Sequence, residues 1–214
     1  LDSMRIVAFT FSFLFSLNWA IAQVAEEQNN KAIELMTEEK YEEAQVILEK
    51  LVADNPSVTL YRYNLAVTLT NLKKRKEALH HYQILIKELP DEAEYYFQAG
   101  DLLEQQDSLK SAVLMYNKSI ELEPDNFQYF FYRGTNYLKR KQFQLAVEDF
   151  NKSVKLNPEH SNSLHNRAIA LYKLGRTLEA CTDWCDALLL DNPNSASHLQ
   201  RNCKVIPSKC LLSK

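Results

Sequence analysis

Glycine is nearly absent from this sequence, with three residues in 214. A β-rich or α/β domain of this length uses more glycine in its turns, so the count indicates an all-α fold. It also excludes a glycine-rich phosphate-binding loop. The chain also has no large excess of charge of one sign, since its formal net charge is −3. It therefore lacks the positive charge that nucleic-acid binding requires. The remaining composition, 46% hydrophobic and 25% charged, is that of a folded globular protein.

Catalytic and metal-ligand patterns are also lacking. The five histidines stand at no catalytic spacing from a serine, cysteine or aspartate; they are His80, His81, His160, His165 and His198. The adjacent pair His80 and His81 diverges by about 100° on a helix and therefore does not share a ligand. We predict a protein that is not an enzyme and that binds no metal or cofactor.

Residues 1–22 have the composition of a secretory signal peptide. Arg5 supplies a basic start, and the run from Ile6 to Ala20 is almost wholly apolar or small. An A-x-A cleavage site ends at Ala22. We predict cleavage after Ala22 and export, to the periplasm of a Gram-negative cell. The alternative is an uncleaved anchor, although about 20 apolar residues are needed to cross a bilayer and this run is shorter.

The rest of the chain repeats itself every 34 residues. Four sets of residues follow this period, the last proline being displaced by one position. The prolines are Pro56, Pro90, Pro124, Pro158 and Pro193. The alanines are Ala44, Ala78, Ala112, Ala146 and Ala180. A large apolar residue follows each alanine by four positions: Leu48, Tyr82, Tyr116, Phe150 and Trp184. A small residue precedes each alanine by twelve positions: Ala32, Ala66, Gly100, Gly134 and Ala168.

Helix packing explains these residue types. Small residues on facing helices allow a close approach, the large residue fills the adjoining space, and proline ends the second helix. The pattern predicts five pairs of helices, at 25–38 and 41–53, 59–72 and 75–88, 93–106 and 109–122, 127–140 and 143–156, and 161–174 and 177–190. Ala196, Leu199 and Cys203 then fall at helical spacing and predict a capping helix over 194–204.

These features resemble the tetratricopeptide repeat. Tyr96-x-x-Ala99-Gly100-x-x-Leu103 follows the family's first-helix pattern, as does the corresponding stretch from Phe130 to Tyr137. The resemblance implies an all-α solenoid over 23–204, with repeats at about 25–58, 59–92, 93–126, 127–160 and 161–193. Polar residues at Gln28 and Lys31 depart from the pattern and suit an N-terminal end repeat that faces water. Residues 205–214 are predicted to be a frayed tail.

All four cysteines lie near the C-terminus, at Cys181, Cys185, Cys203 and Cys210. In an oxidising compartment, a Cys181–Cys203 disulfide would fix the capping helix to the last repeat and leave two free thiols. Cys185 is a rival partner for Cys203. Free buried thiols and a metal site are the remaining alternatives.

The resemblance also implies where ligands bind, namely on the concave face formed by the first helix of each pair. The fifth position of that helix carries rings: Tyr63, Phe97, Phe131 and His165. The sixth position carries groups that can bond a peptide backbone: Asn64, Gln98, Tyr132 and Asn166. Charge is uneven along the face, with acids in the third repeat and bases in the fourth and fifth: Glu94, Asp101 and Glu104 against Lys139 and Lys173.

We expect an extended peptide or a partner helix to lie on this face, anchored on the rings and oriented by the charges. The predicted function is a non-catalytic protein–protein interaction scaffold of the cell envelope, with a protein or peptide partner, no nucleic acid and no membrane span after signal cleavage. Three alternatives remain open. The rings serve helix packing alone, the groove takes a small molecule or glycan in a sensory subunit, or the chain is a self-assembling structural element.

Overall fold

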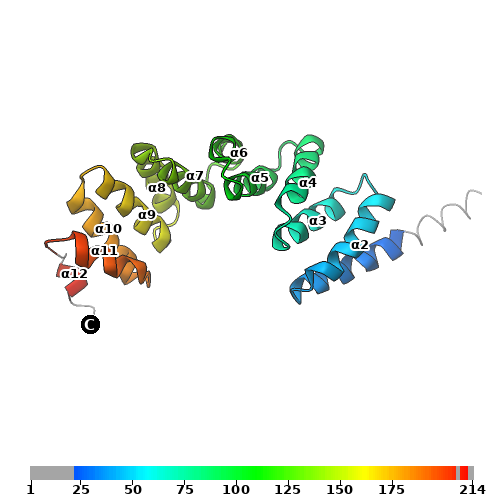
Figure 1. The fold of residues 1–214 in the computed structure, drawn as a ribbon, viewed down its shortest axis with the longest axis horizontal. Coiled ribbons are helices and arrows are strands. Elements are labelled where there is room, and N and C mark those ends of the chain that lie inside the picture. Colours follow the sequence, from blue (N-terminus) through cyan, green and yellow to red (C-terminus); the bar gives the residue numbers. More distant parts are fainter. Residues whose placement is uncertain (1–21, 206–207, 212–214) are drawn as a thin grey trace, which may run out of the picture. The chain divides into compact units, whose positions relative to one another are not determined.

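The computed structural model describes residues 22–205 and 208–211. Within these ranges the chain forms helices joined by short turns, and no strand occurs (Figure 1). Residues 22–37 are helical. The helices that follow are α2 (Tyr41–Asp54), α3 (Thr59–Asn71), α4 (Arg75–Glu88), α5 (Ala93–Gln105), α6 (Leu109–Leu122), α7 (Phe127–Lys139), α8 (Phe143–Leu156), α9 (Ser161–Lys173), α10 (Thr177–Leu189), α11 (Asn194–Asn202) and α12 (Ser208–Leu211). The ten predicted repeat helices are confirmed. The predicted signal peptide lies outside the described residues except for Ala22.

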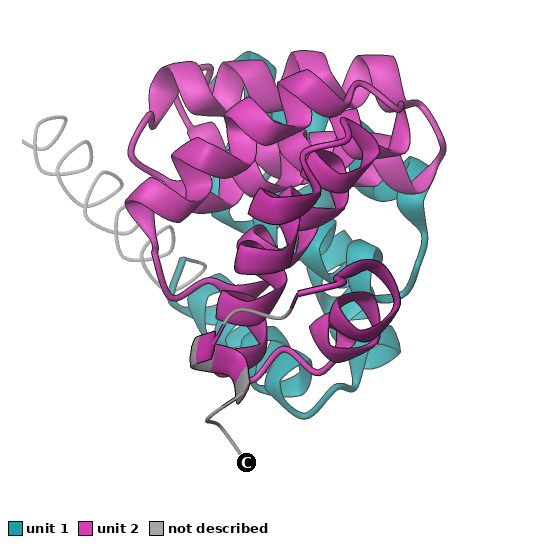
Figure 2. Cartoon of the chain, turned by 90° about the vertical axis from the view of Figure 1, so that its left-hand side faces the viewer, with its two compact units in different colours: residues 1–88 teal, residues 89–214 magenta. Residues whose placement is uncertain are grey.

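The chain divides into two compact units, one ending at Glu88 and the other beginning at Leu89 (Figure 2). In unit 1, α3 packs against both α2 and α4. In unit 2, each helix from α5 to α10 packs against the next one, and α7 also contacts α5 and α9. Contacts between alternate helices are typical of a solenoid, so α5, α7 and α9 form one continuous layer within unit 2.

The small residues of the period lie where two helices approach most closely. A Cβ atom on Gly100 would lie 2.7 Å from the ring of Tyr116, and one on Gly134 would lie 2.9 Å from the ring of Phe150. The alanines of the period and the large residues that follow them are completely buried. The predicted packing of small against large residues is therefore confirmed.

The turn inside every helix pair has the same backbone geometry. One residue with positive φ ends each first helix, and these residues are Glu39, Lys73, Asp107, Lys141 and Gly175. The next residue then donates to a carbonyl five positions earlier, as Ser108 N does to Leu103 O at 2.9 Å. This is a Schellman ending, which satisfies carbonyl groups that the helix leaves unpaired. Gly175 adopts it without a Cβ penalty, whereas in the other four repeats the surrounding structure imposes it.

Two arginines clasp neighbouring repeats of unit 2. Arg133 on α7 donates to both carboxylate oxygens of Asp149 on α8, at 2.8 and 2.6 Å, and to Asn117 Oδ1 on α6 at 2.8 Å. Arg167 on α9 makes the same three bonds one repeat later, to Asp183 on α10 and Asn151 on α8. Each clasp joins three helices. Because the ion pairs are largely buried and bidentate, they are stronger than ordinary surface pairs.

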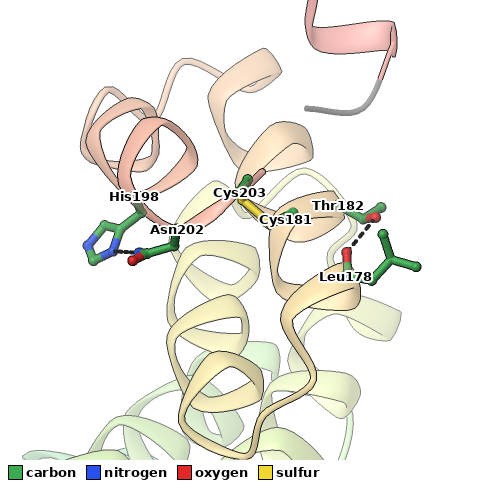
Figure 3. Close-up of a disulfide and its surroundings, with 6 residues drawn as sticks. All are labelled: Leu178, Cys181, Thr182, His198, Asn202 and Cys203. Atoms are coloured by element: carbon green, nitrogen blue, oxygen red, sulfur yellow. Dashed lines mark hydrogen bonds between the residues drawn. A yellow bond between two sulfur atoms is a disulfide. The ribbon is translucent and has the colours of Figure 1, made fainter. Parts of the chain in front are cut away.

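Two disulfides fix the C-terminal helices to the last repeat. Cys181 on α10 is bonded to Cys203 at the end of α11 (Figure 3), and Cys185 on α10 is bonded to Cys210 on α12. The expectation of two free thiols is wrong, because the described residues contain no free cysteine. The expectation of a frayed tail is also wrong for residues 208–211. The Cys185–Cys210 bond holds this helical turn against α10.

Thiol titration of the denatured, unreduced chain is expected to find no reactive thiol, and four after reduction. The reason is that both disulfides are present in the fold. Mass mapping of an unreduced proteolytic digest identifies the pairs. Two thiols before reduction would show that one of the bonds does not form, and four would show that neither does.

Candidate functional site

The predicted contact residues of unit 2 lie on α5, α7 and α9, and their helical spacing places them along one side of each helix, a surface of the layer that these helices form. We call it the α5–α7–α9 face; its residues are Glu94, Phe97, Gln98, Asp101, Glu104, Phe131, Tyr132, Lys139, His165, Asn166 and Lys173. Three contacts join its helices. The rings of Phe97 and Tyr132 lie 4.9 Å apart, and Lys139 Nζ lies 2.6 Å from Glu104 Oε1. Asn166 Nδ2 donates to Thr135 Oγ1 across α9 and α7 at 3.4 Å.

The rings of this face are half-buried and not fully exposed. Phe97 contacts Tyr129 at 5.1 Å and Tyr116 at 6.1 Å between ring centroids. Phe131 contacts His160 at 4.8 Å and Phe150 at 6.1 Å. The fifth-position rings therefore contribute to packing between repeats, and each also leaves part of its surface open.

The C-terminal end of the face is closed by α11. His165 Nδ1 lies 2.8 Å from Ser195 Oγ, and its ring meets the ring of His198 edge-on at 5.3 Å. His198 in turn stacks on Trp184 at 4.9 Å. Burial lowers the pKa of His165, and the neighbouring His198 lowers it further. His165 is thus a half-buried ring held by α11, and its lowered pKa favours the neutral form.

Glu104 is the most buried acid of the face, with 9% of its surface exposed. It accepts from Lys139 Nζ at 2.6 Å and from Asn136 Nδ2 at 2.9 Å, both on α7. The hydroxyl of Tyr116 lies 3.5 Å from its Oε2. Glu104 is therefore a structural group that is already paired, and it ties the exposed Lys139 back to α5.

Glu94 and Asp101 differ from Glu104 because no ion pair with a basic side chain is recorded for either of them among the described residues. Gln98 donates to Glu94 at 2.6 Å and Gln105 donates to Asp101 at 2.7 Å. Burial raises the pKa of Glu94; the Gln98 bond opposes this shift, and the carboxylate of Glu123 adds to it. Burial likewise raises the pKa of Asp101; the Gln105 bond and the charge of Lys139 oppose this shift, and the carboxylate of Glu104 adds to it. Both carboxylates are thus costly to keep charged in this surrounding.

Two of the predicted contact residues belong to unit 1. Tyr63 packs edge-on against Tyr82 at 6.4 Å. Asn64 is 7% exposed and donates to Asn29 Oδ1 at 2.8 Å, which ties α3 to the helix over 22–37. Its amide is therefore engaged in the fold and is not open to a ligand. Lys173, by contrast, is exposed at the end of α9.

Three residues near the face were missed by the sequence analysis: Tyr129, Asn136 and His198. Tyr129 fills the space beside Phe97, and His198 extends the ring row onto α11. Asn136 is completely buried and bonds to Glu104, and this burial is seen only in the structure. The remaining two needed the positions of neighbouring helices.

No helix in the described part of the chain is long and apolar enough to cross a membrane. The same residues hold no cluster of three or more His, Cys, Asp or Glu arranged to bind a metal ion.

Paired helices, a 34-residue period and a repeated turn define an α-solenoid repeat protein. Models of the tetratricopeptide repeat match residues 93–126, 127–160 and 150–182. These matches confirm the predicted tetratricopeptide resemblance for residues 93–182.

Solved structures of repeat proteins share this fold. A MamA structure from Desulfovibrio magneticus RS-1 has a TM-score of 0.74 at 17% identity, covering 78% of this chain and 94% of that one. Another MamA structure has a TM-score of 0.72 at 16% identity, covering 77% and 96%. YrrB, described as a tetratricopeptide repeat protein with an unusual peptide-binding site, has a TM-score of 0.69 at 16% identity, covering 81% and 90%. No curated protein matches the sequence.

Proposed function

We propose that this protein is a non-catalytic interaction scaffold that binds an extended peptide or a partner helix on the α5–α7–α9 face. The observation that carries the proposal is the row of half-buried rings on successive helices, from Phe97 through Phe131 and Tyr132 to His165. Rings held rigidly by neighbours, with part of their surface open, are the groups that supply most binding energy in protein interfaces.

Polar groups beside the rings fit a peptide backbone. Gln98 and Asn166 are half-buried amides at the sixth position of α5 and α9. Each is held by one neighbour, Glu94 or Thr135, at 2.6 and 3.4 Å. An amide has two donor hydrogens and an acceptor oxygen, so bonding capacity is left for a ligand. The peptide-binding site described for YrrB, which has the same fold, supports a peptide as the partner.

We further propose that the scaffold works in the cell envelope. Both disulfides support this location, because disulfides persist in oxidising compartments and are rare in the cytosol. The signal-like composition of residues 1–22 points to the same route of export.

Selection from a random twelve-residue peptide library is expected to yield ligands that Tyr132→Ala binds at least tenfold more weakly. Tyr132 is chosen because its ring is half-buried and its hydroxyl has no hydrogen-bond partner among the described residues. Its ring contacts those of Phe97, Phe131 and the fully buried Tyr116, at 4.9, 5.4 and 6.5 Å, so circular dichroism must show that the variant keeps its fold. A tenfold loss corresponds to about 1.4 kcal/mol, which is typical of an aromatic interface residue. Calorimetry measures the affinities.

Leu114→Ala is the matched control, because Leu114 lies on α6 with 63% of its surface exposed. Its peptide affinity and circular dichroism should equal those of the unchanged protein. If Tyr132→Ala bound the peptides as tightly as the unchanged protein does, the α5–α7–α9 face would not be the binding site. Selection of glycans and no peptides would instead favour the sensory alternative, and concentration-dependent light scattering would favour self-assembly.

A further inference from the structure

The acidic end of the α5–α7–α9 face has more carboxylates than its basic groups neutralise. Glu94, Asp101 and Glu104 lie on α5, and Glu123 precedes α7 close enough to raise the pKa of Glu94. Lys139 is the basic side chain recorded at this end of the face, and its ammonium group is bound to Glu104. Glu94, Asp101 and Glu123 form no ion pair among the described residues of unit 2, although the charge of Lys139 lowers the pKa of Asp101.

Two of these carboxylates stand on one side of α5. Glu94 and Asp101 are seven residues apart, which is two helical turns, or about 10 Å along the axis. Phe97 lies between them in sequence and belongs to the aromatic row. The carboxylates of Asp101 and Glu104 also act on the hydroxyl of Tyr132. Burial raises the pKa of this hydroxyl, and both carboxylates add to the rise. Carboxylates beside open ring faces form a surface that attracts organic cations.

Asn136, at the same end of the face, has a side-chain oxygen to which no described residue donates a hydrogen bond. Asn136 is completely buried, and its amide nitrogen is bound to Glu104 at 2.9 Å. Buried polar atoms are normally paired, but this oxygen is completely buried and is therefore out of reach of a ligand on the face.

We propose that the segment bound on this face carries lysine or arginine side chains that pair with Asp101 and Glu94. The inference rests on the proposed function and names the chemistry of its partner. The charge complementarity gives the segment a direction, with its basic end over α5 and its other end toward Lys173 on α9. A cation beside Asp101 and Glu94 offsets the cost of holding half-buried charges that form no ion pair in the free protein, and this contributes part of the binding energy.

The test uses the peptides selected from the random library and the variant Glu94→Gln with Asp101→Asn. We expect the selected peptides to be enriched in Lys and Arg, and the variant to bind them at least tenfold more weakly. Replacing lysine by norleucine in a peptide should weaken binding to the unchanged protein and have little effect on the variant. Affinity for the unchanged protein should also fall as salt is raised, with a smaller slope for the variant.

The variant is expected to fold normally, because it exchanges half-buried charged groups for neutral amides of the same shape, and these keep an oxygen to accept from Gln98 and Gln105. The control is Glu121→Gln with Glu148→Gln, which removes two exposed acids from α6 and α8 and should leave affinity unchanged.

The outcomes separate the two proposals. Peptides that require Tyr132 but are not enriched in basic residues, and that bind the α5 variant equally well, would overturn this inference and leave the proposed function standing. Equal weakening by the control variant would reduce the effect to net charge and would also overturn it. Failure to select any peptide would overturn the proposed function, and the inference with it.

Discussion

Replacement of Phe150 by alanine is expected to lower the free energy of unfolding of unit 2 by about 3–5 kcal/mol. The Phe150 ring is completely buried on α8, where it packs against Gly134 on α7 and contacts Phe131 at 6.1 Å. Gly134 has no side chain that could move into the space, so most of the cavity should remain. Urea unfolding followed by the fluorescence of Trp184 measures the change.

Trp184 is a suitable probe because it is completely buried in the same core cluster as Phe150. The second tryptophan, Trp19, lies in the predicted signal peptide and is absent from the cleaved chain. Leu114→Ala serves again as the control and should change the free energy by no more than about 0.5 kcal/mol. Equal effects of the two substitutions would contradict the assignment of Phe150 to the core.

Removal of the Cys181–Cys203 disulfide is expected to lower the stability of the last repeat and α11 by about 3 kcal/mol. The bond closes a loop across 22 residues, and in the chain-entropy account a loop of this size contributes about that much. Cys181→Ala with Cys203→Ala avoids burying a new hydroxyl group. Because His198 on α11 stacks on Trp184, release of α11 should move the fluorescence transition to lower urea.

The other disulfide provides the comparison. Cys185→Ala with Cys210→Ala frees α12 but leaves α11 bonded to α10, so the His198–Trp184 contact should survive to higher urea than in the first variant. If the unchanged protein had the same midpoint with and without reductant, neither bond would stabilise this end of the fold.

The helices could be predicted almost to the residue because their signals are local and repeated five times. Gly134, Ala146 and Phe150 specify one contact between two helices, and Pro158 ends the pair. The Schellman turns were not predictable in the same way. Glu39 and Lys141 are not residues that favour positive φ, and they adopt it because the two flanking helices are already fixed.

The sequence predicts which residues belong to the candidate site, but it does not predict which residues surround them. Phe97 and Phe131 follow from the period, but their partial burial depends on Tyr129 and His160, which reach them from neighbouring helices. The engagement of Lys139 with Glu104 likewise joins α7 to α5 across 35 residues. The arginine clasps had a detectable signal, since Arg133 and Arg167 recur at the period together with their aspartates. The structure adds that each arginine also bonds to an asparagine on a third helix.

The pairing of the cysteines was left open because four cysteines allow three pairings. Cys210 lies beyond Pro207, in a stretch whose sequence has no apolar periodicity, and nothing local indicated that it returns to α10. Only the arrangement of α10, α11 and α12 in space brings its sulfur to Cys185.

The two disulfides interleave along the chain, and this gives the C-terminal end a particular covalent topology. One spans residues 181–203 and the other spans 185–210. A single proteolytic cut anywhere between Cys181 and Cys210 therefore leaves the protein in one covalent piece. Between Cys185 and Cys203 every cut is bridged twice. The end of the molecule that carries Trp184 and His198 is thus retained after a nick that would detach the final helices of an uncrosslinked solenoid.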